Sequence, residues 1–476
     1  MARTKPPESL TAKPNAVSDP LHASSARWEA SDWTKLPPEV RTHAEYLWAH
    51  ASLDATNFDT ALRDYPDSAS ARLIRHATCH GIRIRGDTLP QPYDLPNAPD
   101  ATSLEGAPLV RAELHRQNDK YFRPPPHLRS IYIHRLGLVS TWEKSRVIHL
   151  LNLPRGDSIN DHLTYVAYLW VRVTDAAARM YPGCRFIRID IRDYYRNFLV
   201  DPADWILLAF RFGLDPDTTL LTEMWDCFMP FGGRNMVEFA HRVSTFLTWA
   251  LGQLGINNVF TILDDFLIIS TPGQTQTGVF DKACAFLRHL GFPLAGAAHK
   301  THDFQSECDW YGLHLNGDTL QLSFTDAKLD RLLSLIDTAL GQQINVTTAL
   351  SLVGKLQNAG EVIWGVSTHI RPLLAWATHI ESKHEPWHNI RATNESRTAL
   401  RWMRNHLRAN NGLKVVAGDP RPEIRGAADA SDWGYGGVIA DVRNDNTIEL
   451  ASIQWFSFRQ PRGGTSTPSG RPDTRR

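Results

Sequence analysis

The segment VFTILDDFLIIS (259–270) sets the adjacent carboxyl groups of Asp264 and Asp265 between two mostly apolar tetrapeptides, FTIL and FLII. Apolar runs of this length on either side of two polar residues are typical of two buried strands joined by a tight turn. We therefore predict a β-hairpin whose two-residue turn is Asp264-Asp265.

The Asp-Asp pair has an ordinary explanation and a functional one. Aspartate favours turns for its own local hydrogen bonding. Tight hairpins, however, usually use a glycine to supply positive φ, and this pair contains none. Two carboxylates ~4 Å apart also repel by about 4 kcal/mol at an effective dielectric of about 20. We therefore favour the functional explanation and expect cations beside the pair.

A third carboxylate follows another apolar strand in the segment CRFIRIDIRDYYRNFLV (184–200). Asp190 lies at the end of that predicted strand, and taken alone it is equally well explained as a strand-end cap or a surface ion pair. Beside an Asp-Asp hairpin it completes the oxygen donors that Mg²⁺ prefers. We predict a centre for two divalent ions, Mg²⁺ or Mn²⁺. Asp193 is interpreted as an exposed turn residue.

Six segments, in order and with matching spacing across residues 106–380, resemble the sequence motifs of reverse transcriptases. They are SRVIHLLNLPRGDSIND (145–161) in the fingers, IRIDIRDYYRNFLV (187–200) for motif A, MPFGGRNMVEFAHRV (229–243) for motif B, ILDD (262–265) for motif C, LGFPLAGAAHKT (290–301) for motif D and WYGLHL (310–315) for motif E. The fingers segment and the Pro-Phe-Gly form of motif B look most like the tyrosine-recombinase retrotransposons of the DIRS and VIPER kind.

The resemblance implies roles for the residues that match each motif. The predicted metal ligands and catalytic residues are Asp190, Asp264 and Asp265, with Lys300 as the group that protonates the departing pyrophosphate. The predicted nucleotide-binding residues are Arg146 for the triphosphate, Tyr195 as a steric gate against a ribose 2′-hydroxyl, and Phe231 and Gly232 in the motif B turn. The predicted primer grip is Tyr311 and Gly312.

Several of these residues also have bland interpretations. Tyr195 could instead be only a half-buried aromatic residue, although the steric-gate interpretation is favoured, and Arg146 or Lys300 only a solvated charge. Gly232 is equally a helix-start turn, although a missing Cβ permits close approach of a neighbour. The sequence departs from the motifs in two places. Ile262 replaces the tyrosine of motif C, and Gly233, Met236 and Val237 replace the commoner Leu, Ala and Pro of motif B.

The C-terminal segment EIRGAADASDWGYGGVIA (423–440) resembles the opening of a ribonuclease H fold, with Asp429 as the matching metal ligand. TIELASIQWF (447–456) is the expected third strand. Because the further carboxylates of a working enzyme are not found before the Arg/Gly/Pro-rich end, we predict a truncated, inactive fragment.

The predicted fold is α+β: a right-hand polymerase of fingers, palm and thumb with an antiparallel palm sheet, followed by the ribonuclease H-like α/β fragment. The expected divisions are an N-terminal extension with a Pro-rich linker (1–105), fingers and palm (106–318), a helical thumb or connection (319–412), the ribonuclease H-like part (413–458) and a disordered tail (459–476). Helical spacing predicts helices within 329–340, from Leu350, over 363–380 and over 395–408.

Composition narrows the class of protein. The 476 residues are 42% apolar, which favours a folded chain, and Lys plus Arg equals Asp plus Glu at 51 each.

No apolar run approaches the roughly 20 residues that span a bilayer, so we expect no membrane partner. The N-terminus lacks a secretory pattern. Five cysteines without a Cys-x-x-Cys pair favour a reducing compartment, the cytoplasm or nucleus.

The sequence thus predicts an RNA-directed DNA polymerase that binds an RNA or DNA template, a primer and deoxynucleotides. Two alternatives stay open. An RNA-directed RNA polymerase shares the same carboxylate chemistry, although Tyr195 speaks against it. A decayed retroelement product that binds nucleic acid without catalysis is the second.

Overall fold

The computed structural model describes residues 31–457 apart from 87, 141–144, 164–170, 172, 274–275, 386, 415–422, 432–433 and 443–447. The chain divides into two units, Met1–Val415 and Val416–Arg476. The predicted disordered tail, 459–476, lies outside the described residues.

The hairpin predicted at 259–270 is confirmed, with its turn shifted by one residue. Strand β9 is Val259–Ile262 and β10 is Asp265–Ile269, and Asp265 pairs with Ile262. The turn is therefore Leu263-Asp264 rather than Asp264-Asp265. Leu263 supplies the positive φ of 57° that a tight turn requires. Asp265 is thereby the first residue of β10, where its backbone joins the ladder.

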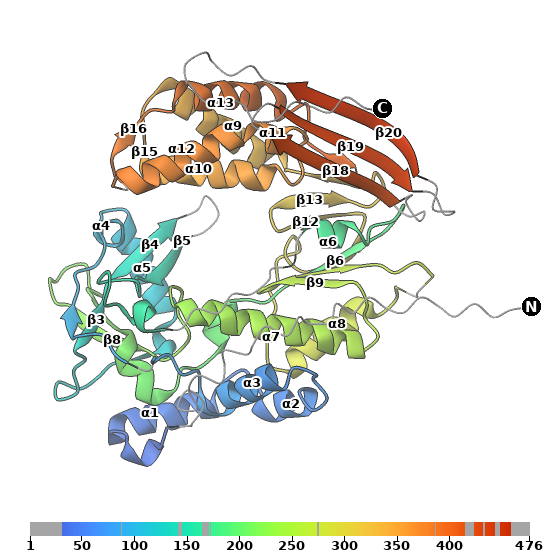
Figure 1. The fold of residues 1–476 in the computed structure, drawn as a ribbon. Coiled ribbons are helices and arrows are strands. Elements are labelled where there is room, and N and C mark those ends of the chain that lie inside the picture. Colours follow the sequence, from blue (N-terminus) through green and yellow to red (C-terminus); the bar gives the residue numbers. More distant parts are fainter. Residues whose placement is uncertain are drawn as a thin grey trace, which may run out of the picture. The chain divides into compact units, whose positions relative to one another are not determined.

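The hairpin belongs to a four-stranded antiparallel sheet in the order β11-β6-β10-β9. Strand β6 is Phe186–Asp190, within the predicted strand, and β11 is His302–Gln305. Figure 1 shows the long helix α7 (Arg234–Gln253) alongside this sheet, with α8 (Val279–His289) beside it.

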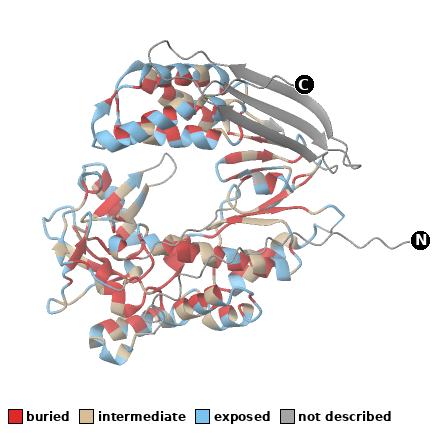
Figure 2. Cartoon of the chain, in the orientation of Figure 1, coloured by how far each residue is buried: buried red, intermediate tan, exposed pale blue. Residues whose placement is uncertain are grey.

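Both faces of this sheet are buried, which explains its continuous apolar strands. Successive strand residues point to opposite faces. Accordingly Ile187, Ile189, Phe266 and Ile268 join one hydrophobic core with α7, whereas Phe186, Leu267 and Ile269 join a second core with the C-terminal helices. Figure 2 shows the buried residues concentrated along these strands and on α7.

A five-stranded mixed sheet carries part of the remaining first unit, in the order β1-β3-β7-β8-β2. Its strands are β1 (Tyr93–Asp94), β3 (Tyr132–His134), β7 (Ala209–Phe212), β8 (Thr222–Asp226) and β2 (Tyr121–Phe122). The β1–β3 and β3–β7 pairs are parallel. A separate hairpin joins β4 (Leu136–Ser140) to β5 (Ser145–His149), near α5 (Gly106–Arg116).

The Pro-rich segment 88–108 is not the linker predicted from its composition. It contains β1, which adds an edge strand to the five-stranded sheet, and the short helix α4 (Pro99–Thr102). The prolines fit because Pro is tolerated at the first turn of a helix and beside edge strands. Composition alone cannot reveal that a short Pro-flanked dipeptide is paired.

The predicted N-terminal extension is likewise part of the fold from residue 38 onward. Helices α1 (Pro38–Ala49), α2 (Ala55–Ala61) and α3 (Ser68–His80) contribute residues to the same hydrophobic core as α7. Phe58 and Ile74, for example, are fully buried in that core. Removing this region would therefore expose the core.

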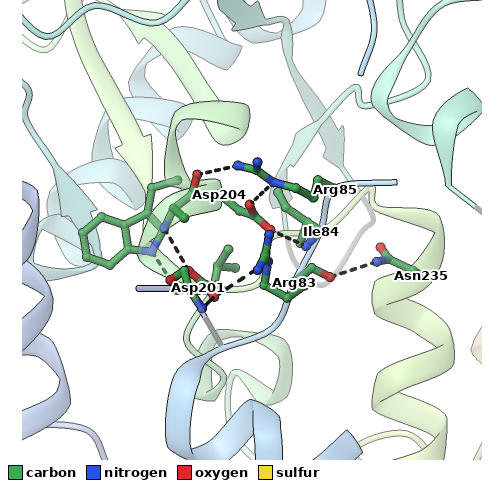
Figure 3. A network of polar contacts seen from close by, with 10 residues as sticks. Arg83, Ile84, Arg85, Asp201, Asp204 and Asn235 are labelled. Atoms are coloured by element: carbon green, nitrogen blue, oxygen red, sulfur yellow. Dashed lines mark hydrogen bonds and ion pairs between the residues drawn. The ribbon is translucent and has the colours of Figure 1, made fainter. Parts of the chain in front are cut away.

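A buried ion-pair network fixes the segment that follows α3 (Figure 3). The Asp204 carboxylate, with no exposed surface, accepts hydrogen bonds from Arg83 Nε (3.1 Å), the Ile84 backbone N (2.9 Å) and Arg85 Nε (2.5 Å). Asn235 of α7 donates to the Arg83 carbonyl. The network thus ties this segment to the 3₁₀-helix Pro202–Leu208 and to α7.

A smaller sheet and a group of helices complete the first unit. The sheet order is β12-β13-β14-β17, from Glu307–Trp310, Leu313–Asn316, Gln321–Ser323 and Leu413–Lys414. The remaining elements are α6 (Val173–Ala177), α9 (Asp326–Gly341), α10 (Val346–Ala359), α11 (Val366–His369), α12 (Arg371–Lys383), α13 (Asn394–His406), β15 (Ile344–Asn345) and β16 (Asn389–Ile390).

Most of the predicted helices are present, with one correction. The helix expected over 363–380 is two helices, α11 and α12. Pro372 lies in the first turn of α12, where its missing N–H costs nothing, whereas inside a continuous helix its ring would clash with an earlier carbonyl. The proline therefore marks the start of a new helix.

The second unit contains three described antiparallel strands, β18 (Glu423–Ser431), β19 (Gly434–Val442) and β20 (Ile448–Ser457). Asp429 on β18 pairs with Gly436 on β19. The strand expected at 447–456 is confirmed as β20. Leu413 and Lys414, assigned from sequence to this part, instead form β17 of the first unit.

Two further findings concern the whole set of described residues. All five cysteines are free thiols. Across the described part of the chain, no helix combines the length and apolar character needed to cross a bilayer.

Replacing Asp204 with Asn should lower the free energy of unfolding by about 2 kcal/mol, because the arginines around a fully buried carboxylate lose its charge. Chemical denaturation measures this loss. Asp59→Asn is the matched control, since Asp59 pairs with Arg75 at the surface and the exposed pair contributes less than about 1 kcal/mol. Equal losses from both variants would contradict the prediction.

Candidate active site

The sheet brings together the three predicted aspartates from distant parts of the chain. Asp190, the last residue of β6, is the direct antiparallel partner of Asp265, the first residue of β10. Directly opposed residues of antiparallel strands project to the same face of a sheet. Asp264 lies in the adjoining turn, where its carbonyl accepts a hydrogen bond from the Ile191 backbone N (2.9 Å).

The proximity of these carboxyl groups affects the pKa values of Asp264 and Asp265. Burial raises the pKa of Asp264 to about 6, and the neighbouring Asp190 and Asp265 carboxylates add to the increase. Burial also raises the pKa of Asp265, even though the Arg188 guanidinium opposes that change. The protein therefore concentrates negative charge where water is partly excluded, an arrangement that is common at functional sites.

Two cations balance part of this charge, as the sequence led us to expect. Arg188 donates from Nε and Nη2 to the two carboxylate oxygens of Asp265, both at 2.9 Å. Lys300 Nζ lies 3.3 Å from Asp190 Oδ2. Sequence analysis singled out Lys300 and missed Arg188. The signal was present, because Arg188 precedes Asp190 by two residues in a strand and so shares its face.

The three aspartates are neighbours but do not form a finished set of metal ligands. Among the residues that the structure describes, no group of three or more His, Cys, Asp or Glu side chains is gathered closely enough to hold a metal ion. The donor chemistry nevertheless suits Mg²⁺, which takes oxygen ligands. The ion pairs of Arg188 with Asp265 and of Lys300 with Asp190 account for the present side-chain positions.

Tyr195 and Phe231 form a wall of two aromatic rings. Tyr195 lies in the 3₁₀-helix Tyr194–Asn197 that follows β6, and it is 8% exposed. Its ring centroid lies 5.0 Å from that of Phe231. Two of the four residues predicted to bind the nucleotide are therefore in contact with each other.

Gly232 occupies a position that only glycine fits. Its φ is +121°, and a Cβ there would overlap the carbonyl oxygen of His149. Asn160 holds the same turn, donating from Nδ2 to the Gly232 carbonyl (2.9 Å) and accepting from the Arg234 backbone N (2.9 Å) at the start of α7. Asn160 lies in the matched fingers segment, but its role in positioning was not anticipated.

Arg146 lies on β5, exposed, opposite Val139 of β4. Burial raises the pKa of Asp264, and the positive charge of Arg146 opposes that rise. Arg146 also lines a pocket beside the ring wall; the lining residues are Glu113, Leu114, Gln117, Tyr121, Ser145, Arg146, Val147, His149, Asp193, Arg196, Asp226, Pro230 and Phe231. The pocket therefore contains two of the four predicted nucleotide-binding residues, Arg146 and Phe231.

Asp193 was predicted to be an exposed turn residue. It does lie in a turn, but its side chain is mostly buried in an ion pair. It adopts the left-handed conformation (φ 49°), but its carboxylate accepts a hydrogen bond from Arg116 Nη1 of α5 at 2.8 Å and is 21% exposed. The partner comes from a helix 77 positions earlier, so the sequence near Asp193 does not reveal it.

Tyr311 and Gly312 form the two-residue turn between β12 and β13, with φ of 50° and 72°. The hairpin expected from WYGLHL is therefore present. Tyr311 is 54% exposed, and the Gly312 carbonyl accepts a hydrogen bond from Lys328 Nζ (2.7 Å). Trp310, just before the turn, donates from Nε1 to the Asp265 carbonyl (3.2 Å). This contact ties the hairpin to the acidic strand.

Asp429 belongs to the second unit, where its backbone on β18 pairs with Gly436 of β19.

No protein-family model and no curated protein matches the chain. Solved structures do match. One is the foamy viral protease-reverse transcriptase dRH in complex with double-stranded DNA, with a TM-score of 0.53 and 14% identity over 91% of this chain and 70% of that chain. Another is the foamy viral protease-reverse transcriptase in complex with an RNA/DNA hybrid, with a TM-score of 0.54 and 14% identity over 91% of this chain and 53% of that chain.

These matches establish a mixed α+β fold similar to that of a retroviral reverse transcriptase. The chain spans about half of the length of the second match and 70% of the first. The predicted fold class is confirmed at this level.

Gly232→Ala should destabilise the protein by more than about 3 kcal/mol, because the new methyl group meets a backbone carbonyl that cannot move freely. Thermal or chemical unfolding measures the change. Gly183→Ala is the control, since Gly183 also has positive φ (78°) but open space around it, and we expect a cost of about 1 kcal/mol. A similar loss in both variants would mean that backbone conformation alone matters.

Asp264→Asn should stabilise the metal-free protein at pH 7.5. The folded pKa of Asp264, about 6, exceeds its ordinary value of 3.8, so the folded state binds the proton more tightly and loses stability as pH rises through this window. After allowance for partial exposure we expect a gain of about 1–2 kcal/mol at pH 7.5 that disappears near pH 4.

Unfolding in EDTA at the two pH values measures this gain. Asp303→Asn, an exposed aspartate in β11 of the same sheet, is the control and should have no pH-dependent effect. A stabilisation that persists unchanged at pH 4 would contradict the electrostatic cause.

Proposed function

We propose that the protein is a reverse transcriptase, an RNA-directed DNA polymerase that extends a primer 3′-end with deoxynucleotides by two-metal phosphoryl transfer. The observation that carries the proposal is the direct pairing of Asp190 with Asp265, beside Asp264, in a chain with the fold of a retroviral reverse transcriptase. The solved structures that it resembles hold double-stranded DNA or an RNA/DNA hybrid, which supports nucleic acid as the partner.

Asp190, Asp264 and Asp265 are the residues that would hold Mg²⁺. When bound, two such ions supply activation of the primer 3′-hydroxyl and charge stabilisation for the leaving pyrophosphate. Metal binding has to compete with Arg188 for Asp265 and with Lys300 for Asp190. The raised pKa of Asp264 supports the same assignment, because a buried carboxylate among like charges gains most from a cation.

The other proposed roles follow from the positions of the side chains. Lys300, beside Asp190, carries a proton that it can give to the departing pyrophosphate. Arg146, which lines the pocket, offers a multi-donor contact for the triphosphate. The Tyr195 ring, held in place against Phe231, is the proposed steric gate against a ribose 2′-hydroxyl.

The cellular role is replication of a retroelement. The amino-acid sequence of residues 145–161 and the Pro-Phe-Gly form of motif B at Phe231-Gly232 favour a retrotransposon of the DIRS or VIPER kind. The strand pairing around Asp429 is compatible with the start of a ribonuclease H-like fragment, for which we propose no hydrolytic activity.

Primer extension tests the proposal. The purified full chain should add dTTP to oligo(dT) on a poly(rA) template with Mg²⁺, and EDTA should abolish the reaction. Asp264→Asn should lose on the order of 10³-fold in rate, because ligand and charge stabilisation are lost together. The control Asp303→Asn, in the same sheet but outside the acidic group, should retain the wild-type rate.

Equal signals from wild type and Asp264→Asn, or no extension by wild type with either Mg²⁺ or Mn²⁺, would refute polymerase activity and favour a non-catalytic nucleic-acid-binding protein. Extension with ribonucleotides and not with deoxynucleotides would instead favour an RNA-directed RNA polymerase.

A further inference from the structure

A buried polar cluster of Arg196, Asp226 and His149 lies behind the proposed nucleotide pocket and has no role in the chemistry described above. All three side chains are at least 95% buried, and all three line the pocket. Arg196 Nη1 donates to both Asp226 oxygens, at 2.8 and 2.7 Å. His149 Nε2 lies 3.3 Å from Asp226 Oδ2, which makes Nε2 the donor nitrogen.

Each member of this cluster adjoins a residue of the proposed nucleotide site. Arg196 directly follows Tyr195 in the same 3₁₀-helix. His149 ends β5, the strand of Arg146, and its backbone N donates to the Phe231 carbonyl at 3.0 Å. The His149 carbonyl is also the group that leaves no space for a side chain at Gly232.

These contacts form a closed ring. It runs from Tyr195 to Arg196 along the chain, through Asp226 to His149, across the backbone hydrogen bond to Phe231, and back to Tyr195 through the ring contact at 5.0 Å. A second arm holds α5, because Arg196 Nε donates to Gln117 Oε1 at 2.5 Å. A shift of any one member therefore displaces the others.

The Arg196–Asp226 ion pair keeps its charges in the protein interior. Burial acts to raise the pKa of Asp226, but the Arg196 guanidinium and His149 hold it below its ordinary value. A buried ion pair usually adds little net stability compared with apolar residues of the same volume. What it does provide is one defined geometry, because its hydrogen bonds are directional. Stability alone is therefore a weak reason for this cluster.

Two polar atoms in the cluster lack a partner. Among the residues that the structure describes, Arg196 Nη2 and His149 Nδ1 are buried without a hydrogen bond. Such atoms are expensive to leave unpaired. Their burial is a second sign that stability alone does not explain the cluster.

We propose that Arg196, Asp226 and His149 are positioning residues, which set the spacing between the Tyr195–Phe231 wall and Arg146 and thereby determine how tightly and how selectively a deoxynucleotide is held. The inference rests on the proposed function, since it concerns the nucleotide site of that polymerase. It adds a set of specificity determinants that do not touch the reacting atoms.

The test compares Asp226→Asn with Asp204→Asn in the full-length chain. Both substitutions remove the charge of a buried, Arg-paired aspartate, but Asp204 lies in the network that anchors the segment after α3 and does not line the pocket (Figure 3). The readouts are KM and kcat for dTTP, and the preference for dTTP over UTP, on poly(rA)/oligo(dT).

Asp226→Asn should raise KM for dTTP by on the order of 10- to 100-fold, the scale expected for a misplaced binding wall, and should reduce the preference for dTTP over UTP. Its kcat should change by less than about threefold, because the aspartates that bind metal are untouched. Asp204→Asn should leave KM and the preference unchanged, even where it costs as much stability. Equal effects of the two variants on KM, or no effect of Asp226→Asn, would overturn the proposal.

A second variant covers the case in which Asp226→Asn fails to fold. The double variant Arg196→Met/Asp226→Leu removes both charges and should fold. It should show the same raised KM and weakened preference, and a wild-type KM would overturn the proposal.

Equilibrium dialysis of dTTP against the protein bound to a dideoxy-terminated primer–template separates this inference from the proposed function. A wild-type protein that extends no primer would refute polymerase activity, yet weaker dTTP binding by Asp226→Asn than by Asp204→Asn would still support the positioning role. A wild-type protein that binds no dTTP would overturn the inference.

Discussion

The pairing of β6 with β10 is the constraint on which the rest of the first unit depends. Antiparallel register sets Asp190 opposite Asp265, and the turn of the hairpin then leaves Asp264 beside both. The repulsion among these groups has to be overcome by burial of the same two strands on both faces. The apolar residues of the strands thus hold the carboxyl groups in a place that their charges alone would not allow.

Charge compensation explains the form of the acidic site. Arg188 binds Asp265 through two hydrogen bonds, and Lys300 pairs with Asp190, whereas burial raises the pKa of Asp264 and makes its charge costly. The three aspartates therefore differ in how their charges are balanced, although they share one site.

The pocket and the acidic group are built by different parts of the molecule, and a few polar contacts join them. Asn160 holds the turn at Gly232, and the Arg196–Asp226–His149 cluster connects that turn to the Tyr195 segment. Such buried hydrogen bonds contribute less to the free energy of folding than the apolar cores do, but they restrict the geometry. The result is a rigid wall beside a charged centre.

Much of this site was evident from the sequence, and the reasons differ by residue. The hairpin, β6 and the helices around Leu329 and Leu400 follow from local patterns of apolar residues, whose period reports the secondary structure directly. The candidate residues followed from motif order. Arg188 was missed although its position two residues before Asp190 was visible.

Only the tertiary structure decided the features that depend on contacts between residues distant in the chain. The sequence by itself predicted β6, the β9–β10 hairpin and helices such as α9 and α13, because these elements arise from patterns among near neighbours, and its motifs named the candidate site residues. It could not show that residues 38–105 pack into the core, that Arg116 binds Asp193, or that Asp226 lies between Arg196 and His149. Those contacts join residues dozens of positions apart, and only the folded chain brings them within hydrogen-bonding distance.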